Sequence, residues 1–279
     1  MARHLSGIDH FVIAVRDLDA ARDDFTRMGF SLTPRGYHSV GSENHCAMFG
    51  NGYLELLTVR RPHPVTAYFS RFLEHGDGAA AMVVATGDAQ ALYRDWCAAG
   101  LPAEAPVSLS RPVLGARGNA LAHFKIVQLD LSYTPGGLVY ACEHLTPELT
   151  HQPQQAGHPN GVTSLAAVTI DIAAGQLSRA AERYERVLAS SACAIDETVR
   201  LVPCADVDVR LQERDRATSQ EVAPRALPYL SSLTFNVESL ELIAETLRRN
   251  GVACERGDGM LSIPGALAHG VTLRFIARR

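Results

Sequence analysis

The sequence predicts an α+β protein built from four βαβββ modules. Three observations predict this fold class: four stretches of the 279-residue chain open in the same way, glycine-containing turns join strand candidates behind them, and a polar linker separates the modules two and two. Internal repetition of this kind identifies an architecture before any single residue is interpreted. The four stretches are GIDHFVIAVRDLDAARDDFTRMGF from Gly7, AAAMVVATGDAQALYRDWCAAGL from Ala79, SLAAVTIDIAAGQLSRAAERYERVL from Ser164 and YLSSLTFNVESLELIAETLRRNGV from Tyr229.

The first module begins with a strand that is mostly apolar on both faces, because His10 and Val12 point to one side and Phe11 to the other. Asp17 is a good N-cap for the helix that follows, and Gly29 ends it. Three further strands complete the module, at residues 31–33, 44–49 and 53–59, with the turn Gly50–Asn51–Gly52 joining the last two as a hairpin.

The other modules repeat this order. The second has a helix capped by Asp88 and ended at Gly100, and its strands are expected at 80–85, near 107, at 121–129 and at 138–145. The third has a helix that ends near Leu188, with strands at 165–172, 198–202 and 207–212. The fourth begins at Leu230, has a helix ended by Asn250, and has strands near 254, at 261–263 and at 271–276.

Two segments read as linkers. The run HQPQQAGHPNG at 151–161 is polar and rich in proline and glycine, and a second loose stretch covers 214–228. Because the first linker divides the modules two and two, we place a domain boundary near residue 155, giving domains at 1–155 and 156–279.

Composition indicates a globular protein, with 47% hydrophobic and 20% charged residues. A net charge of −4 and scattered arginines give no case for nucleic-acid binding, and no apolar run approaches membrane-spanning length. Six cysteines without a regular spacing and the lack of a secretory leader predict a reduced, cytoplasmic protein of bacterial type. The oligomeric state is left open, a homodimer included.

The repeats also serve as an alignment within one chain. His10 falls opposite Ala81, Ala167 and Ser232 in the other three modules. A histidine present at only one of four repeated strand positions is not required by the strand. His10 therefore becomes a candidate functional residue.

Paired βαβββ modules resemble the vicinal oxygen chelate superfamily, which includes glyoxalase I, methylmalonyl-CoA epimerase, extradiol dioxygenases and fosfomycin-resistance proteins. The most specific matches are GIDHFVIAVRDL and GNGYLELL, and GGLVYACEHLTPEL followed by HPNG is similar to the glyoxalase-like branch. The resemblance covers the chain as two such domains. It implies that each pair of modules curls into a cup-shaped mixed sheet, with metal ligands on the first and last strand of each module.

Transferred to this sequence, the resemblance implies a metal site made by His10, Glu55 and Glu143. The usual ligand on the first strand of the second module is missing, because Ala81 and its neighbours cannot bind a metal. One imidazole and two carboxylates suit one divalent ion, Zn, Mn, Fe, Co or Ni, and the sequence does not choose among them. The second domain has Arg210 and Arg274 near the corresponding glutamate positions and is expected to be metal-free.

Several other polar residues are candidates for contact with the substrate. Two of them share one face of a long strand, two lie where a loop enters a strand, and two belong to the HPNG run. In that order they are His123 and Lys125, Asn44 and His45, and His158 and Asn160.

Three functions follow as hypotheses, all involving a small-molecule substrate. The leading one is a metal-dependent lyase or isomerase, in which a substrate with vicinal oxygens forms a metal-stabilised enediolate and Glu143 or Glu55 moves the proton. A ring-cleaving dioxygenase would instead need iron with two imidazole ligands, such as His10 with His45 or His123. The third is a non-catalytic binding or resistance protein.

Overall fold

The computed structural model describes residues 4–115, 118–150, 157–214, 226–257 and 259–277. In these residues all four βαβββ modules are present, in the predicted order. Module one contains β1 (Leu5–Ala14), α1 (Leu18–Arg27), β2 (Gly36–Tyr37), β3 (Ser42–Phe49) and β4 (Gly52–Val59). Module two contains β5 (Gly78–Thr86), α3 (Ala89–Ala98), β6 (Val107–Gly115), β7 (Gly118–Gln128) and β8 (Leu138–His144).

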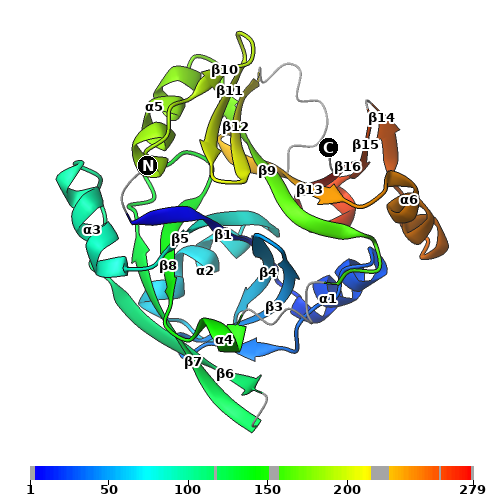
Figure 1. The fold of residues 1–279 in the computed structure, drawn as a ribbon, viewed down its shortest axis with the longest axis horizontal. Helices are drawn as coiled ribbons and strands as arrows, with labels where there is room; N and C mark the ends of the chain where they lie inside the picture. The colour runs from blue at the N-terminus through cyan, green and yellow to red at the C-terminus, as the bar shows by residue number, and fades with distance from the viewer. Residues whose placement is uncertain (1–3, 116–117, 151–156, 215–225, 258, 278–279) are drawn as a thin grey trace.

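The second half of the chain repeats the plan. Module three contains β9 (Val162–Ala173), α5 (Leu177–Leu188), β10 (Cys193–Ala194), β11 (Val199–Cys204) and β12 (Val207–Arg214). Module four contains β13 (Tyr229–Val237), α6 (Leu240–Arg249), β14 (Glu255–Gly257), β15 (Met260–Ile263) and β16 (Thr272–Ala277). The α+β class and the mixed sheets are thereby confirmed (Figure 1).

Each pair of modules makes half of a continuous sheet. The strand order is β2-β3-β4-β1-β5-β8-β7-β6 in the first half and β10-β11-β12-β9-β13-β16-β15-β14 in the second. Within a module the first strand is parallel to the last, and the first strands of paired modules are antiparallel. The two halves meet in the sheet where Leu230 of β13 pairs with Ala79 of β5.

The first half curls into a cup whose rim is closed by its edge strands. The backbone N–H of Ser39, just after β2, donates to the carbonyl of Ser110 in β6 at 2.9 Å. The concave face is lined by a separate apolar cluster that includes Val12, Tyr140 and Phe69. Phe69 belongs to α2 (Ala67–Leu73), which lies within the curve of the sheet (Figure 1).

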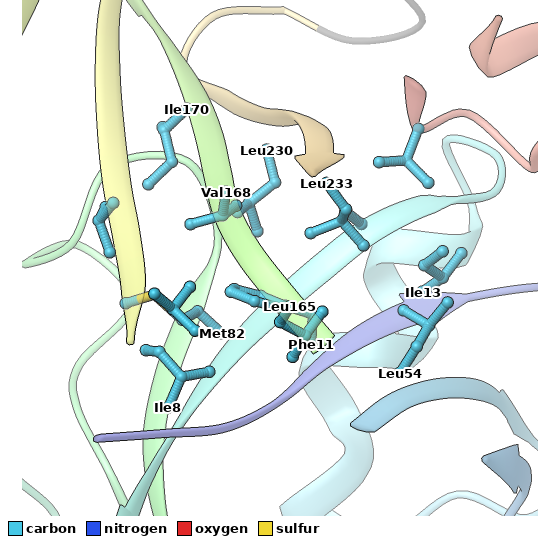
Figure 2. Packing of buried hydrophobic residues seen from close by; sticks show 14 of the residues in the cluster. Ile8, Phe11, Ile13, Leu54, Met82, Leu165, Val168, Ile170, Leu230 and Leu233 are labelled. Carbon is cyan, nitrogen blue, oxygen red and sulfur yellow. The ribbon is translucent and has the colours of Figure 1, made fainter. Parts of the chain in front are cut away.

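The main core lies between the two halves. Side chains on the convex face of β1 and β5, such as Phe11 and Met82, join one buried cluster with Val168 and Leu233 of β9 and β13 (Figure 2). Because both faces of β1 are covered, its near-continuous apolar sequence is explained.

Helix starts agree with the sequence. The Asp17 side chain accepts hydrogen bonds from the N–H groups of Asp19 and Ala20 at the start of α1, and Asp88 accepts one from Ala91 at the start of α3. These caps satisfy backbone donors that a helix cannot pair internally.

Some expectations were wrong or incomplete. Residues 31–33 form no strand, and the second strand of module one is the two-residue β2 instead. No local pattern in the sequence predicted the 3₁₀ turn η1 (Pro64–Thr66), α2 or the short α4 (Pro147–Thr150). A further 3₁₀ turn, η3 (Gly265–Leu267), precedes β16. The predicted boundary near residue 155 lies outside the described residues and stays a prediction.

No helix in the described part of the chain is long and apolar enough to cross a membrane.

Candidate active site

A small cavity of about 70 Å³ opens on the concave face of the first half. Its walls come from β1, β3, β4, β6, β7 and β8, with α2 and the loop before β3. Most of the lining is apolar. The polar side chains that reach it include His10, His38, Asn44, Glu55, Arg111 and His144.

His10 and Glu55 are brought together by two adjacent parallel strands. In the register of β1 and β4, His10 pairs with Tyr53 and Val12 with Glu55, so alternate residues of both strands face the cup. His10 Nε2 lies 3.5 Å from Glu55 Oε2, and the two residues are only 3% and 4% exposed. The His10 ring stacks on Tyr53 with centroids 4.2 Å apart.

Asp9 lies behind His10 and holds its ring. The His10 Nδ1–H donates to Asp9 Oδ1 at 2.6 Å, and His144 Nε2 lies 3.0 Å from Asp9 Oδ2. Regular alternation would send Asp9 to the opposite face, but the β1–β5 register shifts between Ile8 and His10. This irregularity lets two consecutive residues contribute to one cluster.

Gly52 at the start of β4 permits the close approach of that strand to Asp9. It has a φ of +149°, and a Cβ there would lie 2.5 Å from the Asp9 carbonyl oxygen. Any other residue would push β4 away from β1, and with it the register that aligns Glu55 with His10.

Contact between the two side chains raises the pKa of His10 and lowers the pKa of Glu55. Burial raises the pKa of Glu55, but hydrogen bonding and charge attraction to His10 outweigh it and lower the pKa to about 2. Burial lowers the pKa of His10, but bonds to Asp9 and Glu55 reverse this and raise it to about 9. At neutral pH the pair is therefore an imidazolium beside a carboxylate.

Other polar groups surround the pair. Tyr140 Oη of β8 accepts from His10 Nε2 at 3.2 Å, and the Asn44 amide of β3 donates to Glu55 Oε1. His38 Nε2 lies 4.0 Å from Glu55 Oε1, and its Nδ1 bonds with Ser42 at 3.0 Å. The pKa of His38 is lowered, mainly because the ring is buried, so His38 is neutral at physiological pH.

Glu143 is not part of this cluster. Its carboxylate accepts a hydrogen bond from the backbone N–H of Ala89 at 3.0 Å, at the first residue of α3. On β8 the side chains that face the cavity are Cys142 and His144, one residue to either side. The expected face was therefore off by one residue, and the ligand set of His10, Glu55 and Glu143 does not assemble.

Of the six expected substrate contacts, only Asn44 lines the cavity. His45 points to the other face of β3, where its Nδ1 donates to the Thr33 carbonyl at 2.8 Å. His123 and Lys125 alternate with the cavity-facing residues of β7, and the His123 side chain is exposed.

The HPNG run holds the chain together instead of closing the cup. His158 accepts from Ser31 N–H at 3.0 Å and donates to the Met48 carbonyl at 2.8 Å. Asn160 is fully buried, and its amide donates to the Met28 carbonyl at 3.0 Å. Neither residue lines the cavity.

The donors present make an incomplete metal site. Two of the three expected ligands, His10 and Glu55, lie together, but among the described residues no group of three or more His, Cys, Asp or Glu side chains is placed to hold a metal ion.

Comparison with known proteins agrees with this fold. A family model described as "Glyoxalase-like domain" matches residues 8–188, and no curated protein matches the sequence significantly. The chain therefore belongs to the glyoxalase-like domain family.

Solved structures share the fold at low sequence identity. A hypothetical protein from Staphylococcus aureus has a TM-score of 0.71 at 12% identity, over 97% of this chain and 99% of its own. A mutant of 4-hydroxymandelate synthase from Streptomyces coelicolor has a TM-score of 0.68 at 16% identity, over 99% and 93%. A xylose isomerase-like TIM barrel/4-hydroxyphenylpyruvate dioxygenase fusion protein has a TM-score of 0.62 at 14% identity, over 99% and 49%.

Proposed function

We propose that this protein is a glyoxalase-like enzyme of the lyase or isomerase type, acting on a small substrate with two adjacent oxygen atoms. One observation carries the proposal: His10 and Glu55 lie side by side, almost fully buried, at the wall of a small cavity. Burying two ionisable groups costs free energy, and strongly shifted pKa values in a cavity are typical of catalytic groups.

The protonation states suit a proton transfer next to a carbonyl group. Glu55 is a carboxylate and can accept the proton as a general base. His10 is protonated and can donate a hydrogen bond from Nε2 to the oxygen where negative charge develops. Asp9 fixes the imidazole ring through Nδ1, so that Nε2 points toward Glu55 and the cavity.

Metal dependence is the second part of the proposal, and the Asp9–His10 contact favours it. A carboxylate that accepts from one ring nitrogen is the usual support of a metal-binding histidine. With an ion bound, His10 Nε2 would carry no proton, and Nε2 and the Glu55 carboxylate would be the two protein ligands. The ion would then take the place of the imidazolium in polarising a substrate oxygen.

A ring-cleaving dioxygenase is a further candidate, favoured by one contact. The histidines expected for it, His45 and His123, do not line the cavity. His38 does, with Nε2 4.0 Å from Glu55 Oε1. Two imidazoles and a carboxylate are the donors that non-haem iron uses in oxygenases.

The test follows substrate C–H loss by NMR in D₂O with three substrate classes: 2-oxoaldehydes and 2-oxo acids, 2-hydroxyacyl thioesters and 2-hydroxy acids, and, under oxygen, catechols. We expect turnover or exchange with one of the first two, reduced about 100-fold or more in His10→Gln and Glu55→Gln. Glu43→Gln is the matched control, since Glu43 on the same hairpin pairs with Arg35 at 3.0 Å and does not line the cavity.

Elemental analysis and chelator treatment accompany each assay. Activity that is lost with EDTA and restored by one divalent ion supports metal dependence, and oxygen-dependent catechol cleavage with bound iron would favour the dioxygenase. Unchanged rates in Glu55→Gln would contradict the proposal, and binding without turnover of any class would identify a binding protein instead.

A further inference from the structure

The seam that closes the cup also brings a cation to the cavity wall. Two hydrogen bonds join the seam, from Ser39 N–H to the Ser110 carbonyl at 2.9 Å and from Ser110 N–H to Ser39 Oγ at 3.2 Å. His38, which precedes Ser39, and Arg111, which follows Ser110, both line the cavity. Arg111 is thus delivered by β6, the strand farthest along the sheet from β2.

The Arg111 guanidinium is unpaired in the described part of the chain. It forms no ion pair or hydrogen bond there, although it is half-buried. By contrast, Arg35 and Arg60, near the same rim, both pair with Glu43. A half-buried guanidinium without a carboxylate has lost hydration and has five donors to offer.

The backbone at Gly36 packs closely against both Arg111 and Asn44. A Cβ at Gly36 would lie 2.9 Å from Arg111 Nη1 and 2.3 Å from Asn44 Oδ1, so both atoms lie close to one point. Asn44 Oδ1 is buried and has no hydrogen-bond partner in the described residues. Arg111 and Asn44, whose amide N–H donates to Glu55 Oε1, therefore line the same part of the cavity wall.

The position of Arg111 at the cavity wall favours an anion there. The two carboxylates of the site, Asp9 and Glu55, both contact His10. Among the described residues neither carboxylate forms an ion pair with Arg111, so its guanidinium donors face the cavity unpaired. An unpaired guanidinium in a low-dielectric cavity attracts an anionic ligand, and it fits a carboxylate by two parallel hydrogen bonds.

We propose that Arg111 binds a carboxylate of the substrate, so that the enzyme acts on small 2-oxo or 2-hydroxy acids. This inference rests on the proposed function and names the substrate class of the same site. The carboxylate on Arg111 leaves the neighbouring oxygen and the carbon beside it for His10 and Glu55.

The experiment is calorimetric titration of the intact protein with pyruvate, lactate, the neutral ester methyl pyruvate, and inorganic phosphate. We expect pyruvate or lactate to bind wild type, with the Kd raised about 10- to 100-fold in Arg111→Gln. Arg111→Lys should give an intermediate Kd, because lysine keeps the charge and loses the two-pronged geometry. Arg94→Gln, which removes an exposed arginine from α3, is the matched control.

The outcomes are distinguishable. Equal Kd values in wild type and Arg111→Gln, no carboxylate binding by wild type, or binding of phosphate alone would each overturn the inference. Should Arg111→Gln fail to fold, Arg111→Lys decides, since an unchanged Kd there contradicts two-pronged binding. If the proposed function fails while this inference holds, pyruvate or lactate will bind through Arg111 but show no C–H exchange in D₂O.

Discussion

At the scale of single residues, the site depends on one imidazole placed between two carboxylates. His10 contacts Asp9 through Nδ1 and faces Glu55 through Nε2, and both contacts stabilise its protonated form. Burial opposes that charge. Loss of either carboxylate would therefore lower the pKa of His10.

Replacing Glu55 by Gln should lower the pKa of His10 from about 9. Glutamine removes a negative charge and keeps the size of the side chain, so burial gains weight against the imidazolium. NMR titration of the His10 ring, in protein treated with a chelator to remove metal, measures this pKa, with Glu43→Gln as the control. A His10 pKa that does not fall in Glu55→Gln would show that the pair is not coupled in solution.

At the scale of elements, β8 illustrates how one strand serves two sites. Its inward residues Tyr140, Cys142 and His144 line the cavity, whereas the outward Glu143 bonds to the start of α3 at Ala89 N–H. A carboxylate at a helix N-terminus accepts from a free backbone N–H and interacts favourably with the positive end of the helix dipole. Glu143 is thus a structural residue of the β8–α3 contact.

We expect Glu143→Ala to lower the free energy of unfolding by about 1 kcal/mol, the usual loss for a helix cap, and to leave substrate turnover unchanged. Urea unfolding together with the D₂O assay measures both quantities. Asp17→Ala, which removes the cap of α1, is a matched comparison for stability. Turnover lost in Glu143→Ala without a change in stability would return Glu143 to the active site.

At the scale of the whole molecule, His269 ties the two halves together. It lies between η3 and β16, and its ring contacts Asp77 Oδ2 at 2.9 Å and Asp24 Oδ2 at 3.1 Å, both in the first half. Burial lowers the pKa of His269, but Asp77 and Asp24 outweigh it and raise the pKa above 6.5. Burial likewise raises the pKa of Asp77, which His269 and Arg16 lower to about 2.

These shifts fix the pH range in which the contact stabilises the fold. The raised His269 pKa gives stability that is fully present below pH 6.5 and is lost as pH rises through the folded-state pKa. The lowered Asp77 pKa gives stability present above pH 3.8 and lost as pH falls toward about 2. The contribution is therefore greatest between these limits.

His269→Gln should cost on the order of 1–2 kcal/mol of unfolding free energy at pH 6 and distinctly less at pH 9. Thermal or urea unfolding at the two pH values measures the difference, and the exposed His123→Gln serves as the control. A loss of the same size at both pH values would mean that the imidazolium charge contributes nothing.

The sequence by itself determined the four modules, their order, the caps Asp17 and Asp88, and the histidine found in one repeat only. These follow from local periodicity, since strand alternation and helix capping are read within a few residues. The family resemblance also implied that His10 and Glu55 face the same cup, and the regular register between β1 and β4 brings them together.

Only the tertiary structure decided the rest of the site. Asp9 reaches the site because the β1–β5 register is irregular beside His10. On β8 the cavity-facing residue is His144 and not the expected Glu143, because one step along a strand reverses the face. His38 and Arg111 lie 73 positions apart in sequence and met where the sheet curls closed. The curvature that brings distant strands together is set by packing over the whole sheet, which no local pattern records.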